Sequence, residues 1–206
     1  MRSLDGIAEV LIEEFDRKNA AREESFRLCR LAIRNSSRAI RSVHRGQLED
    51  AETFLAEVCT MLNQVKTLLK DYPDVRYAGF FDDAEQEYAE AKIIYSIIVD
   101  HNILIPEEIG VEPVNYLSGM GDVTGELRRH ILDLIRQGKP EEGEYYLEIM
   151  DEIFHMLMLF DYPDAITRGL RKKSDLARSM IERTRGDLTN AMEIRKVEML
   201  LRSCRG

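Results

Sequence analysis

The chain has 206 residues, enough for one sizeable domain with a full hydrophobic core, and we expect a single domain over residues 1–206. Hydrophobic residues make up 44% and charged residues 33%, with 12 glycines and 5 prolines, which excludes collagen-like and wholly disordered proteins. Three cysteines without motif spacing indicate neither a disulfide framework nor a zinc cluster. The net charge of −9, taken alone, argues against a polyanionic partner.

The sequence contains no signal for membrane insertion or export. Its first residues lack an apolar signal segment, and no run of about 18 uninterrupted apolar residues occurs. We therefore expect a soluble, cytoplasmic protein that does not associate with membranes.

Helical periodicity runs along the whole chain. Apolar residues recur at spacings of three and four, and no convincing strand-like alternation is found. All five prolines fall where a helical pattern stops. The pattern predicts an all-α fold. The helices are expected over residues 4–44, 48–70, 80–103, 113–136, 141–160 and 164–203.

Arginines concentrate in the first predicted helix. Residues 22–45 hold seven arginines and two glutamates, a local charge of +5 in a chain of net charge −9. Six of the arginines follow helical spacings of three and four and therefore line one side of the helix, which we call the arginine ridge: Arg27, Arg30, Arg34, Arg38, Arg41 and Arg45. Such a ridge could grip the phosphates of RNA or DNA, or it could pair with carboxylates in a solvated or interface network.

Two acidic pairs lie on the helices predicted over 80–103 and 113–136. Glu87 and Glu90 are three residues apart and in line with Ile94, and Asp122 and Glu126 are four apart on one face. If the two helices pack together, these four side chains, which we call the carboxylate cluster, form an all-oxygen site suited to Mg²⁺ or Mn²⁺. Alternatively, each acid forms an ordinary surface pair with a nearby arginine.

Two further features predict close packing. Gly121 and Gly125 are unfavourable inside a helix by about 1 kcal/mol each, and close approach of another backbone would explain them. Residues 149–160 are nearly apolar on all sides, so we expect this segment to be buried in the core or in a subunit interface.

The acidic segments resemble the translin and TRAX (translin-associated factor X) family. The resemblance rests on Gln86-Glu-Tyr-Ala-Glu-Ala91, Val114-Asn-Tyr-Leu-Ser-Gly119 and Gly121-Asp-Val-Thr-Gly-Glu-Leu-Arg128. The segment Arg41-Ser-Val-His-Arg-Gly46 is similar to the first helix of that family. The similarity extends over nearly the whole chain.

This resemblance implies a seven-helix, translin-like bundle of long antiparallel helices that assembles into a hollow homo-octamer around single-stranded RNA or DNA. In the TRAX branch, the residues that match Glu87, Glu90 and Asp122 form a metal-dependent ribonuclease site. Glu126 would be either a further ligand or a carboxylate that supports the ligands without contacting the metal. Translin lacks these acids and serves as a binding scaffold. The Tyr-Leu-Ser-Gly segment looks more like translin, so the chain combines features of both branches.

We therefore expect an Mg²⁺- or Mn²⁺-dependent endoribonuclease that cleaves single-stranded RNA inside an oligomeric shell. The carboxylate cluster would be both catalytic and metal-binding. The expected nucleic-acid-binding residues are Arg34, Arg38, Arg41, His44 and Arg45. The alternative is a non-catalytic protein of the translin type that binds single-stranded RNA or DNA.

Overall fold

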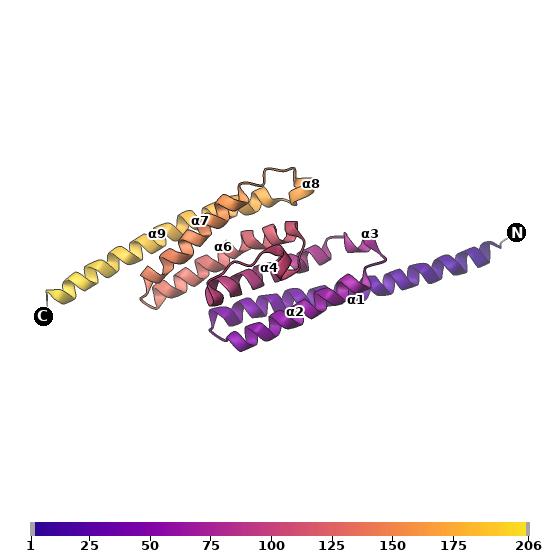
Figure 1. Ribbon diagram of the computed structural model, residues 1–206, viewed down its shortest axis with the longest axis horizontal. Helices are drawn as coiled ribbons and strands as arrows, with labels where there is room; N and C mark the ends of the chain where they lie inside the picture. Colours follow the sequence, from indigo (N-terminus) through magenta and orange to yellow (C-terminus); the bar gives the residue numbers. More distant parts are fainter. Residues whose placement is uncertain (1–2, 205–206) are drawn as a thin grey trace.

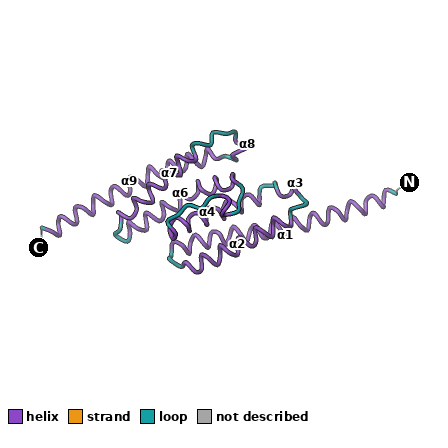
Figure 2. The backbone as a smooth tube through the Cα atoms, viewed as in Figure 1, coloured by secondary structure: helices purple, strands orange, loops and turns teal. Residues whose placement is uncertain are grey.

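The computed structural model describes residues 3–204, which form helices joined by short connections (Figure 1; Figure 2). The six long helices are α1 (Leu4–His44), α2 (Leu48–Leu68), α4 (Phe80–Tyr95), α6 (Pro113–Arg136), α7 (Gly143–Leu157) and α9 (Leu170–Ser203). Shorter elements lie in the connections: α3 (Pro73–Arg76), the π-helical turn η1 (Ser96–Asp100), α5 (Pro106–Ile109), the 3-10 turn η2 (Pro140–Glu142) and α8 (Asp164–Thr167). This part of the chain contains no strand, and the all-α prediction is confirmed.

The number of helices differs from the seven expected. Residues 3–204 contain six long helices and three single-turn ones. Each short helix begins at or directly after a proline, because proline fixes φ near the helical value and needs no hydrogen bond at the first helical position. The prolines that separate the long helices therefore also start short ones.

The helices pack in the order α2, α1, α4, α6, with α7 and α9 covering α6 on the far side (Figure 1). Short connections make α1 and α2, and α6 and α7, antiparallel neighbours, and the longer segment 158–169 with α8 does the same for α7 and α9. The central pair differs, because α4 and α6 run parallel: Glu85 contacts Asn115 and Gln86 contacts Asp122. The return segment 96–112 makes this parallel pairing possible.

Most helix boundaries follow the sequence signals, but two predicted helices are shorter. The helix expected over 80–103 ends at Tyr95 and continues as η1 only to Asp100. The helix expected over 164–203 is broken, because Arg168 and Gly169 both have positive φ values, 51° and 82°. At its start α1 is capped by the Ser3 hydroxyl, which accepts a hydrogen bond of 3.1 Å from the Gly6 N–H.

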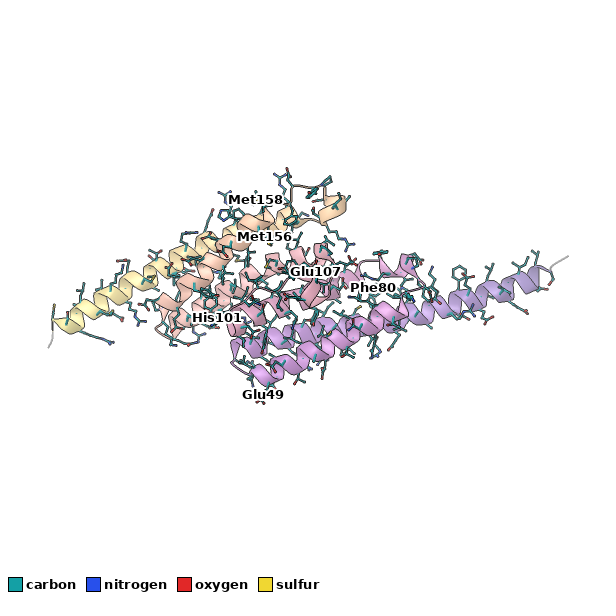
Figure 3. All side chains as sticks on the ribbon, in the orientation of Figure 1. Glu49, Phe80, His101, Glu107, Met156 and Met158 are labelled. Atoms are coloured by element: carbon teal, nitrogen blue, oxygen red, sulfur yellow. The ribbon has the colours of Figure 1, made fainter. Side chains whose placement is uncertain are left out.

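The core is continuous through the centre of the molecule, whereas both ends carry exposed apolar side chains. Ile93, Ile94 and Ile97 are fully buried, as the helical stripe predicts. In contrast, the start of α1 and the end of α9 project beyond the bundle in opposite directions (Figure 1). Met158 is also 58% exposed at the outer edge of the molecule (Figure 3), so the segment 149–160 is only partly covered within one chain. None of the helices in residues 3–204 has the length and apolarity needed to cross a bilayer.

Candidate functional site

Gly119 sets the distance between α4 and α6. A Cβ atom at Gly119 would lie 2.7 Å from the Gln86 carbonyl oxygen and 2.9 Å from the Glu90 nitrogen. Both distances are too short for any residue but glycine, so the backbones of the two helices are in direct contact here. This contact places Glu87 and Glu90 of α4 beside Asp122 of α6, as the sequence predicts for the carboxylate cluster.

Glu87 and Glu90 of α4 are partly or almost fully removed from solvent, and neither has a positive partner in contact among residues 3–204. Glu90 is 9% exposed and Glu87 is half-buried. Burial raises the pKa of Glu90 to about 8, and repulsion from Asp122 and the other carboxylates of the cluster contributes to this rise. Burial also raises the pKa of Glu87. Among the described residues no hydrogen-bond donor acts on either group, so both carboxylates can accept a ligand.

Asp122 is held by α9 and α4. The ammonium Nζ of Lys173 donates to both Asp122 oxygens, at 2.5 and 2.6 Å, and Gln86 Nε2 donates to Oδ2 at 2.8 Å. Gly121 makes this possible, because a Cβ there would lie 2.9 Å from Lys173 Cβ. The close approach expected at Gly121 is therefore to a side chain of α9, whereas nothing lies within 4 Å of a Cβ at Gly125 and the expectation is wrong there.

Glu126 has a different environment from the other three acids. Its Oε2 lies 2.6 Å from His44 Nε2 and 3.6 Å from Arg129 Nη1. The hydrogen bond with His44 lowers the pKa of Glu126, and the charge of Arg129 adds to this effect. Glu126 is thus stabilised as a carboxylate while Glu90 is not.

His44 lies inside the protein. Its side chain is 2% exposed, and its Nδ1 atom is buried without a hydrogen-bond partner among the described residues. We expected His44 to bind nucleic acid together with the neighbouring arginines, but a phosphate cannot reach a side chain buried to this extent. The structure instead places the His44 ring against the Glu126 carboxylate.

The donor set of the cluster fits a hard divalent cation. Its side chains offer only carboxylate oxygens, the ligands that Mg²⁺ and Mn²⁺ prefer. A positively charged ammonium already sits on Asp122, and Glu90 is buried without a partner. Within residues 3–204, however, no three His, Cys, Asp or Glu side chains are close enough to hold a metal ion together. Side chains of the cluster would therefore have to turn towards a cation on binding.

The arginine ridge extends along α1 towards this cluster. Arg41 lies one turn before His44 on the same side of α1, and His44 contacts Glu126. No ion pair among residues 3–204 involves Arg34, Arg41 or Arg45, which are all exposed. The interpretation as a salt-bridge network within the chain therefore fails for these three residues.

Two other arginines of the ridge contact side chains of the same chain. Arg38 is half-buried and its guanidinium carbon lies 5.6 Å from the centroid of the Phe54 ring. Arg27 pairs with Glu24 at 2.6 Å. Arg30 is exposed and has no ion pair either, so within residues 3–204 the exposed members of the ridge without an ion pair are Arg30, Arg34, Arg41 and Arg45.

Known proteins share both sequence and fold with this chain. The uncharacterised protein MJ0175 of Methanocaldococcus jannaschii is 31% identical over 186 residues, 89% of this chain and 82% of the relative. A solved structure of an AfC3PO–duplex RNA complex is 33% identical, with a TM-score of 0.84 over 91% of this chain and 97% of that chain. The crystal structure of AfC3PO gives 34% identity and a TM-score of 0.83, over 91% and 98%. The chain belongs to the translin/TRAX-like C3PO family.

More distant comparisons are informative about the fold alone. The crystal structure of apo-NeC3PO is 24% identical and has a TM-score of 0.75 over 93% of this translin/TRAX-like chain and 98% of that chain. No model of a protein family matches the sequence.

Two members of the site in this translin/TRAX-like chain are not predicted from its sequence. Lys173 and Gln86 both hold Asp122, and neither was predicted to do so. Gln86 adjoins Glu87 in the family segment, so its position was a usable signal. Lys173 lies 51 residues from Asp122, and the only local sign of its contact is the glycine at 121.

Proposed function

We propose that this translin/TRAX-like chain binds RNA and cleaves single-stranded RNA with the help of Mg²⁺ or Mn²⁺. The observation that carries the proposal is the contact of α4 and α6 at Gly119, which gathers the carboxylate cluster around a buried, unpartnered Glu90. RNA as the ligand is supported by the AfC3PO–duplex RNA complex, which is 33% identical over nearly the whole chain.

Glu87, Glu90 and Asp122 would hold the cation, with Glu126 beside them. Such a cation, when bound, activates water and stabilises negative charge at phosphorus. The residues of the chain prepare the site in two ways. Glu90, with a pKa of about 8, carries a proton near neutral pH and must release it before it can act as a ligand. His44 and Arg129 keep Glu126 ionised.

RNA cleavage tests the catalytic part of the proposal. Wild type is expected to cleave a labelled single-stranded RNA in Mn²⁺ or Mg²⁺, and EDTA or Glu90→Gln should abolish cleavage. Glu152→Gln on the exposed side of α7 is the matched control and should cleave like wild type. Cleavage that survives both EDTA and Glu90→Gln would refute a metal-dependent site at this cluster. Binding without cleavage in any divalent metal would instead establish the alternative, a non-catalytic binder of the translin type.

Salt titration tests the ridge as the RNA-binding surface. Each phosphate contact to a single strand contributes about 0.7 to the slope of log affinity against log salt concentration. Arg34→Ala combined with Arg41→Ala should therefore reduce the slope by about 1.4 and weaken binding to unrelated RNA sequences. Arg136→Ala with Arg178→Ala is the control, because both arginines are exposed on other helices. An unchanged slope in the ridge variant would place the RNA elsewhere; duplex RNA and single-stranded DNA in the same titration define the preferred nucleic acid.

We also propose that copies of the chain assemble, with a homo-octamer as the expected form. Support comes from apolar side chains that one chain leaves uncovered, such as Leu159 at 78% and Leu200 at 66% exposure. Exposed apolar groups on this scale are typical of protein interfaces.

A further inference from the structure

Lys173 is the positive group that the structure places against the acids of α4 and α6. Its ammonium contacts both oxygens of Asp122, and its charge lowers the pKa values of Glu87 and Glu90 against the larger effects that raise them. Arg129, the other cation of the region, contacts Glu126 instead. One ammonium group therefore partly neutralises three neighbouring carboxylates.

The fold holds this ammonium group in place from both sides. The Lys173 side chain is about one quarter exposed, at 28%, the same fraction as Asp122. Gly121 lies directly under its stem, where a Cβ atom would be 2.9 Å from Lys173 Cβ. The residues on either side on α9 differ: Lys172 is exposed to solvent and Ser174 is buried, its hydroxyl donating to the Leu170 carbonyl. The helix thus directs one specific lysine at Asp122.

A cation that binds Asp122 must use the same two oxygens. Both are occupied by Lys173 Nζ, and Oδ2 also accepts from Gln86. An ammonium and a divalent cation cannot both contact one carboxylate oxygen pair without strong repulsion. The Lys173 ammonium therefore opposes binding of a divalent cation at Asp122, and displacement of Lys173 relieves the repulsion.

We infer that Lys173 is a positioning residue that occupies Asp122 in the metal-free protein and competes with the divalent cation for it. This inference rests on the proposed metal-dependent function. It names Lys173 as the group that sets the cation concentration at which the site is filled. Without metal, the ammonium prevents the acids from repelling one another. With metal, the displaced ammonium is a free positive charge beside the site.

The test is a titration of the protein with Mn²⁺ in the absence of RNA, in which electron paramagnetic resonance measures the concentration of free Mn²⁺. A positive charge within 4–6 Å lowers the affinity of a carboxylate for a proton by about 10–1000-fold. It should likewise lower the affinity of the carboxylate for a metal cation. Lys173→Met is therefore expected to bind Mn²⁺ at least about tenfold more tightly than wild type. Lys173→Arg, which keeps the charge, should restore the weaker binding, and Lys172→Met should equal wild type.

A double-mutant cycle locates the effect on Asp122. In an Asp122→Asn background, Lys173→Met should raise Mn²⁺ affinity much less than in wild type, because the carboxylate that the ammonium contacts is gone and only its longer-range effect on Glu87 and Glu90 remains. The increase in melting temperature on adding Mn²⁺ should also be larger for Lys173→Met than for wild type, which provides a second readout if the variant is less stable.

The outcomes separate this inference from the proposed function. Equal or weaker Mn²⁺ binding by Lys173→Met overturns the inference, while metal-dependent RNA cleavage by wild type would still support the function. An increase in Mn²⁺ affinity that is equally large in the Asp122→Asn background also overturns it. Absence of Mn²⁺ binding in wild type and in every variant overturns both the inference and the metal-dependent part of the function.

Discussion

Carboxylates that are close together in space have very different environments in this site. Glu90 is buried and has no positive contact, so its pKa is raised to about 8. Glu126 accepts from His44 and pairs with Arg129, so its pKa is lowered. Asp122 is paired with the Lys173 ammonium. One cluster thus contains an acid that is protonated near neutral pH and an acid that is ionised.

The buried Glu90 makes the folded protein sensitive to pH. Its pKa in the folded state lies above the model-peptide value of 4.5, so its contribution to stability is complete below 4.5 and is lost as the pH rises to about 8. Glu90→Gln removes this titration. In EDTA, at about pH 9, the variant should exceed wild type in free energy of unfolding by more than about 1.4 kcal/mol, the equivalent of one pKa unit.

Urea unfolding of wild type and Glu90→Gln at a series of pH values measures this difference. The gain should shrink towards pH 5, because wild-type Glu90 is then protonated and resembles glutamine. Glu152→Gln, at an exposed position, should show no such dependence. A difference between variant and wild type that is independent of pH would contradict the raised pKa.

At the residue scale, the sequence predicts which acid is buried but not which side chains pair with the acids. The helical stripe of Glu87, Glu90 and Ile94 correctly indicates that Glu90 faces the interior. The contact of Lys173 with Asp122 joins helices that are far apart in the chain, and local periodicity carries no information about such partners. The sequence does not predict the buried position of His44, because Arg41 and Arg45, three residues before it and one after it, are exposed.

At the scale of the elements, prolines and glycines specify most of the helices. Helix α6 begins at Pro113 and ends at Arg136, as predicted. The break between α8 and α9 was missed because it uses Arg168, a residue that seldom adopts a positive φ, beside Gly169. The parallel pairing of α4 and α6 was also missed, since it depends on the path of the return segment 96–112 and not on any helical pattern.

Gly119 and Gly125 lie in the same helix, and replacing each by alanine should change the stability of the protein in opposite directions. A Cβ at 119 meets the backbone of α4 at 2.7 Å, so Gly119→Ala must separate α4 from α6. We expect it to lower the free energy of unfolding by about 1–3 kcal/mol. A Cβ at 125 meets nothing within 4 Å, and Gly125→Ala should raise the free energy of unfolding by about 0.5–1 kcal/mol through helix propensity.

Urea denaturation of the two single variants compares them directly, with circular dichroism to verify that helix content is kept. The RNA cleavage assay adds a functional readout, because separation of α4 and α6 should also reduce cleavage by Gly119→Ala. Equal stability of the two variants would mean that the contact at Gly119 does not limit how closely the helices pack.

At the scale of the whole molecule, both projecting ends have the pattern of an interface. Residues 4–16 of α1 hold five acidic residues and no basic ones, yet they also carry a stripe of apolar side chains. The stripe repeats at spacings of three and four and is exposed throughout: Leu4, Ile7, Leu11 and Phe15. The end of α9 repeats the arrangement with Ile194, Val197 and Leu201. Within residues 3–204 these stripes stay uncovered, because each end extends past the bundle (Figure 1).

Assembly through the projecting end of α1 gives a measurable prediction. Leu11→Glu combined with Phe15→Glu places two charges in the apolar stripe, where burial against a second copy would leave them unpaired at a cost of several kcal/mol. In sedimentation experiments the wild type is expected at a multiple of 23.9 kDa, eightfold for the octamer, and the double variant should shift towards a lower mass. Its helix content should stay unchanged, since both positions are exposed in the single chain, at 47% and 64%.

Ala20→Glu adds a charge on the opposite side of the same helix and should assemble like wild type. A wild type that sediments as a monomer at micromolar concentration, or a double variant that keeps the full mass, would contradict assembly through this stripe.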